Sequence, residues 1–299
     1  MKNKLLITGS TGFVGRHLIP VLINNGFKVL EITRSKNKSI KLFGSTTSKI
    51  EVNDFKFEQK IIDFNPEIII HLASCLTSSD EFEDVRKLID TNITFFSKIL
   101  NVTKKIKLKL FINTGTFAEY SSGDNQDYYP AYLYSATKTA SRSFLHYYST
   151  TYNFKEFTVV PYTIYGGDDS QKKIIDYLLD SKDSNKGIDL SPGNQKLDFI
   201  HIDDIVDLYI HLIKNQKTIP NRQNIFAGTG VGTTLKDLAT LISNHTENKL
   251  NLNWGRKEYR KNDIMVATAP IGLNNFTPKW RAKTTLNTGL KKYINKKNK

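Results

Sequence analysis

The chain has 299 residues, of which 39% are hydrophobic and 24% charged, a composition typical of globular proteins with one large or two modest domains. It excludes a disordered or fibrous chain. No stretch approaches the ~20 consecutive apolar residues of a membrane-spanning helix, and the apolar start breaks at Thr8 without a leader cleavage site. The single cysteine, Cys75, has no partner for an internal disulfide, so we expect a cytoplasmic protein with no membrane partner.

Lysine and arginine number 43 against 29 acidic residues, so the formal net charge is +14. The basic residues are scattered, and the only dense run is KKYINKKNK at residues 291–299. Without a groove-reading motif, this excess does not predict nucleic-acid binding, but it favours an anionic substrate through electrostatic steering. No group of residues has metal-ligand spacing, so no metal site is expected.

Short β-branched runs alternate with longer amphipathic segments through the first half of the chain. The predicted strands cover residues 4–8, 28–33, 67–72, 108–114 and 157–161. The predicted helices cover residues 13–25, 55–63, 81–104 and 131–152. This alternation predicts an α/β fold in which helices cover both faces of a parallel sheet.

The alternation becomes irregular beyond residue 165, where loops rich in Gly and Asp separate short strands and helices. We therefore expect a main domain over residues 1–164 and a smaller lobe made of residues 165–200 and 222–299. A helix near residues 203–214 lies in a segment, 201–221, that we expect to return to the main sheet.

A glycine-rich turn, TGSTGFVG at residues 8–15, lies between the first predicted strand and the first predicted helix. Gly9 permits a tight turn, Gly12 permits close approach of a pyrophosphate, and Gly15 permits close packing of helix on strand. In this context the turn predicts a Rossmann-type, doubly wound sheet with phosphates at the helix amino terminus, although a tight turn without ligand is the alternative. The candidate cofactor contacts in the turn are Gly9, Thr11, Gly12, Phe13, Val14 and Gly15.

The end of the second strand distinguishes the two nicotinamide coenzymes. An acid there accepts hydrogen bonds from the ribose hydroxyls of NAD, whereas a cation accommodates the 2′-phosphate of NADP. The strand ends at Thr33 and is followed by Arg34, Lys36 and Lys38, which favours NADP(H). Glu31, earlier in the strand, is the competing acid, so NAD(H) is the alternative cofactor.

Tyr134 and Lys138 are four residues apart on a predicted helix and so lie on one face of it. A phenol with a pKa near 10 is a poor acid–base catalyst at neutral pH, but a neighbouring cation lowers that pKa. The pair therefore predicts a proton donor.

At this point the sequence resembles the extended short-chain dehydrogenase/reductase superfamily, in the branch of nucleotide-sugar epimerases, dehydratases and reductases. The likeness covers nearly the whole chain. It rests on the glycine-rich turn, HLAS at residues 71–74, YSATK at 134–138, PYTIYGGDD at 161–169, LSPGNQKLDFIHIDDIVDLY at 190–209 and GRKEYRKNDIM at 255–265.

The resemblance implies a set of functional residues. The implied catalytic residues are Thr116, Tyr134 and Lys138, and the implied further cofactor contacts are Arg34, Asp54, Leu72, Ala73, Ser74, Lys138 and Pro161. The implied substrate contacts are Thr116, Thr163, Lys196, Arg256 and Arg260. Asn92 falls where the family has an asparagine that stabilises the central sheet. The lobe then becomes the substrate-binding lobe, and we expect a homodimer.

The sequence departs from the family at positions that carry chemistry. Thr116 is followed by Phe117 and Ala118, where the dehydratases have an Asp-Glu pair. Ala118 and Gly167 occupy the positions of the Cys and His of reductases that also epimerise, and Leu197 replaces an arginine that contacts the substrate diphosphate.

By elimination within the family, the resemblance implies an NADPH-dependent 4-ketoreductase that acts on a nucleotide-linked 4-keto-6-deoxyhexose for surface polysaccharides. The chain looks most like reductases that finish CDP-linked dideoxyhexoses or dTDP-linked 6-deoxyhexoses. Two alternatives stay open: an NAD-dependent nucleotide-sugar 4-epimerase, and a dinucleotide-binding sensor without catalysis.

Overall fold

A computed structural model describes residues 3–77, 79–120, 127–169, 171–246, 249–260, 262–276 and 278–297. Its main element is a seven-stranded sheet in the order β10-β6-β5-β4-β1-β2-β3. The strands are β1 (Lys4–Thr8), β2 (Lys28–Thr33), β3 (Ser48–Glu51), β4 (Ile68–His71), β5 (Leu110–Thr114), β6 (Lys155–Pro161) and β10 (Gln223–Ala227). Every neighbouring pair in this sheet is parallel.

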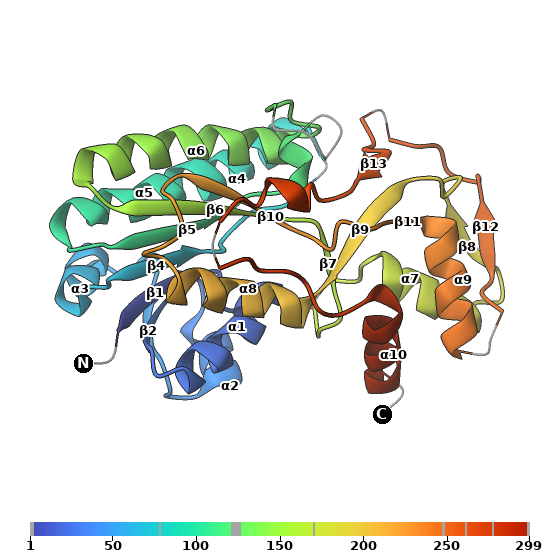
Figure 1. Cartoon of the computed structure of the whole chain (residues 1–299), viewed down its shortest axis with the longest axis horizontal. Helices are drawn as coiled ribbons and strands as arrows, with labels where there is room; N and C mark the ends of the chain where they lie inside the picture. The colour runs from blue at the N-terminus through green and yellow to red at the C-terminus, as the bar shows by residue number, and fades with distance from the viewer. Residues whose placement is uncertain are drawn as a thin grey trace.

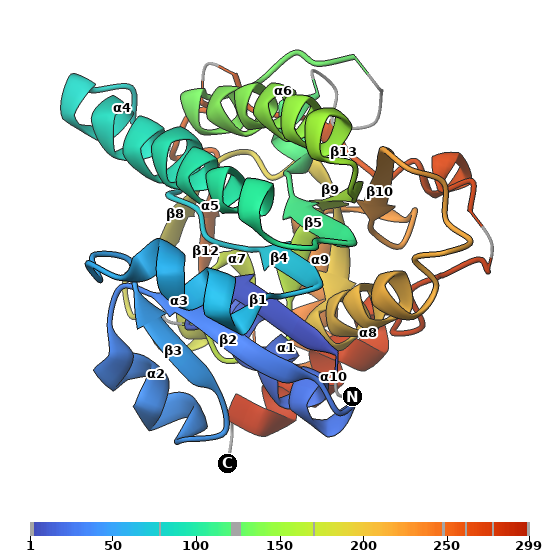
Figure 2. The ribbon, with the colours of Figure 1, turned by 90° about the vertical axis from the view of Figure 1, so that its left-hand side faces the viewer.

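The sheet is buried on both faces because its central strands are apolar throughout. In β1, Leu5 and Ile7 face one layer of helices, whereas Leu6 faces the other. Helices α1 (Phe13–Asn24) and α8 (Ile202–Lys214) cover the first face, and α3 (Phe57–Phe64), α5 (Phe96–Val102) and α6 (Leu133–Tyr152) cover the second (Figures 1 and 2). The predicted doubly wound α/β fold is confirmed.

The segment that the sequence predicts as one helix over residues 81–104 is continuous but irregular. It consists of α4 (Phe82–Ile89), a π-helical turn over Asp90–Phe95, α5 and a 3₁₀ turn over Thr103–Lys105. π-Helical turns are rare and occur frequently at functional sites. This one carries Asn92.

The structure adds two elements that the sequence patterns do not predict. Helix α2 (Lys36–Phe43) contains Lys36 and Lys38, and its N-cap Ser35 accepts a hydrogen bond from the Lys38 N–H. Strand β3 then closes the edge of the sheet beside β2. Both elements are short, so their periodicity is weak in the sequence.

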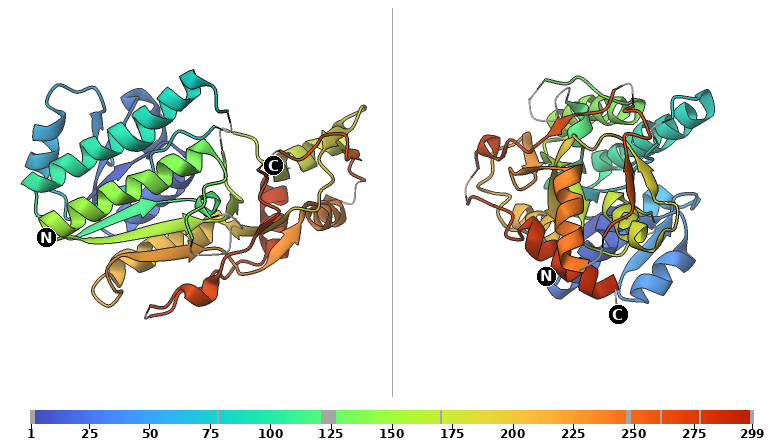
Figure 3. Two further views of the ribbon diagram at one scale, coloured as in Figure 1. Left: turned by 90° about the horizontal axis from the view of Figure 1, so that it is seen from above. Right: turned by 90° about the vertical axis from the view of Figure 1, so that its right-hand side faces the viewer.

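A smaller lobe lies at one end of the main sheet (Figure 1). Strand β9 (Lys196–His201) pairs with β7 (Thr163–Tyr165), β11 (Gly232–Thr234) and β13 (Val266–Ala267), and β8 (Ile188–Leu190) pairs with β12 (Leu252–Trp254). Helices α7 (Ile174–Asp180), α9 (Leu235–Thr246) and α10 (Leu286–Lys297) share an apolar cluster around Leu178, Leu238 and Leu290. Figure 3 shows α9 and α10 side by side at this end. Further 3₁₀ turns lie at Phe117–Glu119, Ser181–Asp183 and Ile271–Leu273.

The prediction that the whole segment 222–299 belongs to the lobe is wrong for two parts of that segment. Strand β10 belongs to the main sheet, where it extends the parallel order beside β6 after the crossover through α8. Phe276 and Trp280 also pack into the core under α8, and the Trp280 indole N–H donates to Asp207 at 3.0 Å. No described helix is long and apolar enough to cross a membrane.

Candidate active site

The candidate active site lies beyond the carboxyl ends of the central strands, where open α/β sheets bind their ligands. Thr116 follows β5 and begins the 3₁₀ turn Phe117–Glu119, because its hydroxyl accepts the Ala118 N–H at 3.3 Å. Tyr134 and Lys138 project from the first turns of α6. The structure thus brings the three predicted catalytic residues together at this edge.

Tyr134 borders a cavity of about 390 Å³ that is lined by Leu76, Thr77, Tyr132, Tyr134 and Arg260. The side chains of Ser74 and Thr116 lie close enough to its hydroxyl to lower its pKa. A substrate oxygen that enters the cavity can therefore meet two neighbouring hydroxyl groups, from Thr116 and Tyr134.

The pKa of Tyr134 contradicts the expectation drawn from the sequence. The pKa is raised to about 12, chiefly by burial and also by the charge of Glu119, against the lowering effect of the Ser74 and Thr116 side chains. The sequence pattern predicts that Lys138 brings this pKa down, but desolvation dominates. Tyr134 therefore keeps its proton at neutral pH.

Lys138 is 4% exposed, and burial lowers its pKa to about 8. Glu119 opposes this shift, whereas Arg142 adds to it. Lys138 is consequently a cation at neutral pH that becomes neutral in mildly alkaline solution.

The glycine-rich turn has the geometry that a dinucleotide requires. Gly9 adopts a positive φ of 69°, and a Cβ atom there would lie 2.6 Å from the Ala73 nitrogen. A Cβ atom on Gly15 would lie 2.5 Å from the Ser10 carbonyl oxygen. Gly12 is the N-cap of α1 and provides no side-chain cap, which leaves the first N–H groups of the helix to an anion. The residues present therefore fit a bound pyrophosphate.

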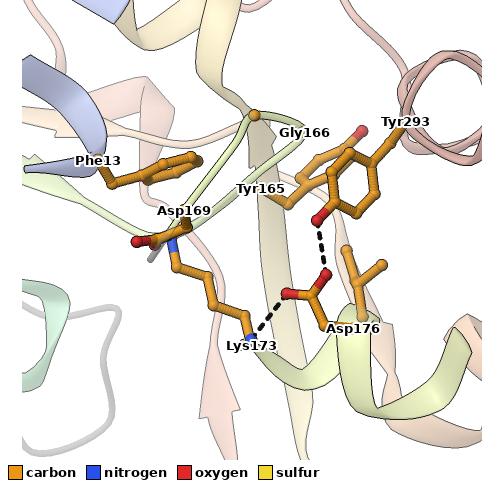
Figure 4. A pocket seen from close by; sticks show the side chains of 9 residues that line it. Phe13, Tyr165, Gly166, Asp169, Lys173, Asp176 and Tyr293 are labelled. Carbon is orange, nitrogen blue, oxygen red and sulfur yellow. Dashed lines mark hydrogen bonds and ion pairs between the residues drawn. The ribbon is translucent and has the colours of Figure 1, made fainter. Parts of the chain in front are cut away.

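The side chain of Phe13, at the start of α1, is held by the smaller lobe (Figure 4). The Lys173 ammonium lies 3.5 Å from the centroid of the Phe13 ring and pairs with Asp169 at 3.2 Å. Asp176 accepts hydrogen bonds from the Lys173 N–H at 2.8 Å and from the Tyr293 hydroxyl at 2.6 Å. The enclosed space is about 10 Å³, enough for one water molecule. These contacts therefore hold the Phe13 side chain in place and do not form a ligand site. The sequence patterns did not point to Lys173.

Glu31, the competing ribose acid, is engaged elsewhere. It is fully buried, and its carboxylate accepts hydrogen bonds from the Ser39 and Thr47 hydroxyls and lies 3.5 Å from the Lys49 ammonium. Arg34, in contrast, is exposed just before the amino terminus of α2. Arg34 is thus a charged side chain that is presented directly beyond β2.

Asp54, an implied cofactor contact, begins the segment that leads into α3. Its carboxylate accepts the Lys56 N–H at 2.9 Å and pairs with the Lys60 ammonium, and these hydrogen bonds lower its pKa. The residue therefore stabilises the entry to α3, whatever contact it also makes with a cofactor.

The loop Leu72–Ser74 is fixed from two sides. The Ala73 N–H donates to the Thr8 hydroxyl at 3.2 Å, next to the glycine-rich turn. The Asn92 side-chain carbonyl accepts the Cys75 N–H at 2.8 Å, and its NH2 group donates to the Cys75 carbonyl at 3.1 Å and to the Thr137 hydroxyl at 2.9 Å. The π-helical turn that carries Asn92 therefore connects the loop after β4 with α6. Pro161 and Thr163 lie at the end of β6 and the start of β7, near the same sheet edge.

The three cationic residues among the implied substrate contacts, Lys196, Arg256 and Arg260, have different positions. Arg260 lines the cavity, and its backbone N–H donates to Asp263, which also accepts the Tyr132 hydroxyl at 3.4 Å. Lys196 lies in β9, where its side chain runs against Gly232, and Arg256 is exposed. Leu197 packs between two apolar clusters instead of facing an anion. Only Arg260 of the three shares a cavity with Tyr134 in the part of the chain that the structure covers.

The parallel sheet, the glycine-rich turn and the tyrosine–lysine helix define a dinucleotide-binding α/β enzyme. The chain belongs to the NAD dependent epimerase/dehydratase family, whose sequence profile matches residues 5–228. As a member of this family it is an NAD(P)-dependent enzyme. Among the described side chains, no group of three or more His, Cys, Asp or Glu residues is placed to hold a metal ion.

Several curated proteins are similar to this chain along most of its length. A CDP-abequose synthase of Yersinia pseudotuberculosis is 29% identical over 88% of this chain and 91% of its own. A CDP-abequose synthase of Salmonella typhimurium is 28% identical over 90% of each chain, and Protein CapI of Staphylococcus aureus is 27% identical over 97% of each. Among solved structures, a UDP-glucose 4-epimerase of Thermotoga maritima superposes with a TM-score of 0.82 at 20% identity, over 99% of this chain and 100% of its own. The structural match confirms the fold.

Proposed function

We propose that this protein is an NADPH-dependent 4-ketoreductase that acts on a nucleotide-linked 4-keto-6-deoxyhexose, in the synthesis of deoxysugars for surface polysaccharides. The position of Tyr134 on a cavity that Arg260 also lines, close to Thr116, carries the proposal. A reduction needs a proton donor beside the carbonyl oxygen, and the Tyr134 hydroxyl on this cavity can supply that proton.

The residues of the cavity take complementary parts in the proposed reaction. When bound, NADPH supplies a hydride to C4 of the sugar. Tyr134 donates its proton to the carbonyl oxygen, which becomes the hydroxyl group. The Thr116 hydroxyl hydrogen-bonds that oxygen and positions it. The Lys138 ammonium stabilises the negative charge that develops when Tyr134 loses its proton, since a buried cation acts strongly at short range.

We propose that the smaller lobe binds the nucleoside diphosphate, with Arg260 as its main cation. A guanidinium forms two parallel hydrogen bonds to phosphate oxygens, which lysine cannot reproduce. The position of Arg260 on the cavity that Tyr134 borders supports this assignment. The similarity to CDP-abequose synthases favours a CDP-linked substrate as the first to test.

The coenzyme that we propose is NADPH. The exposed Arg34 stands before the amino terminus of α2, and no acidic residue occurs in the first turn of this helix. Both features favour the extra phosphate of NADP. The buried carboxylate of Glu31, which already has three partners, supports the same choice.

We further propose that the protein forms a homodimer through α4 and α6, which contact each other along one side of the molecule. Five large apolar side chains on these helices are exposed: Phe82 and Ile89 on α4, and Leu133, Phe144 and Tyr147 on α6. Exposed apolar side chains on two helices that contact each other support an interface at this side of the molecule. Tyr147→Lys should convert the dimer to a monomer in light scattering, and an unchanged molar mass would move the interface elsewhere.

The test of the reaction is a screen of the purified protein against 4-keto-6-deoxy sugars linked to CDP, dTDP, GDP and UDP, with the loss of NADPH absorbance as the signal. Tyr134→Phe should lower turnover by roughly 100-fold or more, the range of general acid catalysis, while NADPH binding stays unchanged. Turnover near that of the wild type would remove Tyr134 from the mechanism. Protein that retains NAD and interconverts 4-hydroxy sugars without added NADPH would instead be a 4-epimerase.

A further inference from the structure

A buried ion pair lies directly behind the candidate active site. Glu119, at the end of the 3₁₀ turn that Thr116 begins, is fully buried, and Arg142, two turns beyond Tyr134 on α6, is 4% exposed. The guanidinium forms two parallel hydrogen bonds with the carboxylate, Nε to Oε2 at 2.6 Å and Nη2 to Oε1 at 3.1 Å. This bidentate arrangement fixes both side chains in one geometry.

The pair connects the separate segments that carry the reacting groups. Glu119 Oε1 accepts the backbone N–H of Thr116 at 2.7 Å, so the carboxylate fixes the residue that carries the active-site hydroxyl. Arg142 belongs to the same helix as Tyr134 and Lys138, and its Nη1 donates to Asn224 of β10 at 2.6 Å. The Thr116 segment, α6 and β10 are thus joined through one ion pair.

Gly115 makes room for this arrangement. A Cβ atom at residue 115 would lie 2.4 Å from Glu119 Oε1 and 2.7 Å from Arg142 Nη2. Any larger residue before Thr116 would displace one of the two charges. The glycine that precedes the active-site threonine is therefore explained by the ion pair.

A buried ion pair is a weak source of stability, because desolvation of the two charges offsets their attraction. Its place between the reacting groups needs another reason. Resting on the reduction proposed above, we propose that the Glu119–Arg142 pair is a positioning unit, which holds the Thr116 hydroxyl against the Tyr134 hydroxyl and sets the charge around Lys138.

The second part of this role follows from the ionisable groups that act on Lys138. These are Glu119 of the 3₁₀ turn and Arg142 of α6, and Lys138 in turn acts on His71 of β4; Tyr134 lies on the same face of α6. Burial holds the pKa of His71 well below its usual range, and Tyr134 is protonated, so both are neutral at pH 7. Glu119 is then the anion that favours the ammonium form of Lys138. Removal of its charge makes Lys138 lose its proton at lower pH.

Two substitutions of Glu119 separate position from charge. Glu119→Asp keeps the charge but withdraws the acceptor from the Thr116 N–H, and it leaves Arg142 with a partner, so the protein should fold. Glu119→Gln keeps an acceptor but removes the charge. The matched control is Glu156→Gln on β6, whose carboxylate is equally buried at the opposite end of the sheet and bonds Ser149 at 3.0 Å.

Both Glu119 variants should lower kcat about 10- to 100-fold, the effect of a small misplacement of a reacting group, with little change in KM. In Glu119→Gln alone, the pH at which NADPH binding weakens should move to lower values, and this readout needs no sugar reduction. Glu156→Gln should lower only the melting temperature. Wild-type kcat and an unshifted NADPH-binding profile in both Glu119 variants would reduce the pair to a structural role. A wild-type protein that reduces no 4-keto sugar would overturn the proposed reduction, and the NADPH profile would still decide the role of the Glu119 charge.

Discussion

Replacement of Lys138 by methionine should stabilise the fold while it abolishes the reaction. Methionine has a similar length and no charge, so it fills the same buried space without the cost of an ammonium group. Each tenfold change in proton affinity corresponds to about 1.4 kcal/mol. A pKa of about 8 in place of the ordinary 10.5 therefore means that the charged lysine costs the folded state about 3 kcal/mol at neutral pH.

The pH dependence gives this prediction its distinguishing feature. Because burial lowers the pKa of Lys138, the unfolded chain binds a proton between pH 8 and 10.5 that the folded protein does not. The contribution of Lys138 to the free energy of unfolding consequently rises with pH between pH 8 and 10.5. The full destabilisation by the charged lysine is present only below this range. Lys138→Met should thus gain about 3 kcal/mol at pH 7 and almost nothing near pH 10.5.

Urea denaturation at both pH values measures the difference, with Lys172→Met as the control, since Lys172 is an exposed lysine paired with Asp180. The control should show no gain at pH 7. An equal free energy of unfolding for Lys138→Met and the wild type at pH 7, or a gain that persists unchanged near pH 10.5, would refute the reasoning. A confirmed gain would mean that the enzyme keeps a destabilising cation because the reaction requires it.

Three further predictions concern ligand binding. Arg34→Ala should weaken NADPH binding by about 1.5–3 kcal/mol, the scale of a hydrogen bond to a charged group, and leave NADH binding unchanged in fluorescence titrations; equal weakening of both coenzymes would refute the assignment. Arg260→Lys should raise the KM of the nucleotide sugar, and Arg260→Ala should raise it further, whereas unchanged nucleoside diphosphate affinity by calorimetry would direct attention to Arg256 and Lys196. Lys173→Met should weaken NADPH and NADH alike by about 0.5–2 kcal/mol, because the cation–π contact that orients Phe13 is lost. Lys172→Met removes the adjacent charge, which does not contact Phe13, and should have no effect. Identical coenzyme affinities of the two variants would contradict the role of Lys173 in holding Phe13.

The sequence by itself determined the parts of this protein that depend on neighbours along the chain. Strand and helix periodicity predicted the parallel sheet, the glycine spacing predicted the dinucleotide turn, and helical spacing placed Tyr134 and Lys138 on one face. These features are local because a strand repeats every two residues, a helix every 3.6, and a tight turn involves only adjacent residues. The roles of Thr116, Tyr134 and Lys138 in catalysis stay predictions until the variants are measured.

Only the tertiary structure decided the features that depend on residues distant in sequence. It assigned β10 to the main sheet, enclosed the carboxylate of Glu31 and placed Arg260 on the cavity that Tyr134 borders. It also reversed the expected direction of the Tyr134 pKa and paired Glu119 with Arg142, 23 positions apart. The physical reason is the same in each case. Desolvation and ion pairing depend on what surrounds a group in three dimensions, and that environment is assembled from segments whose order along the chain does not reveal their proximity.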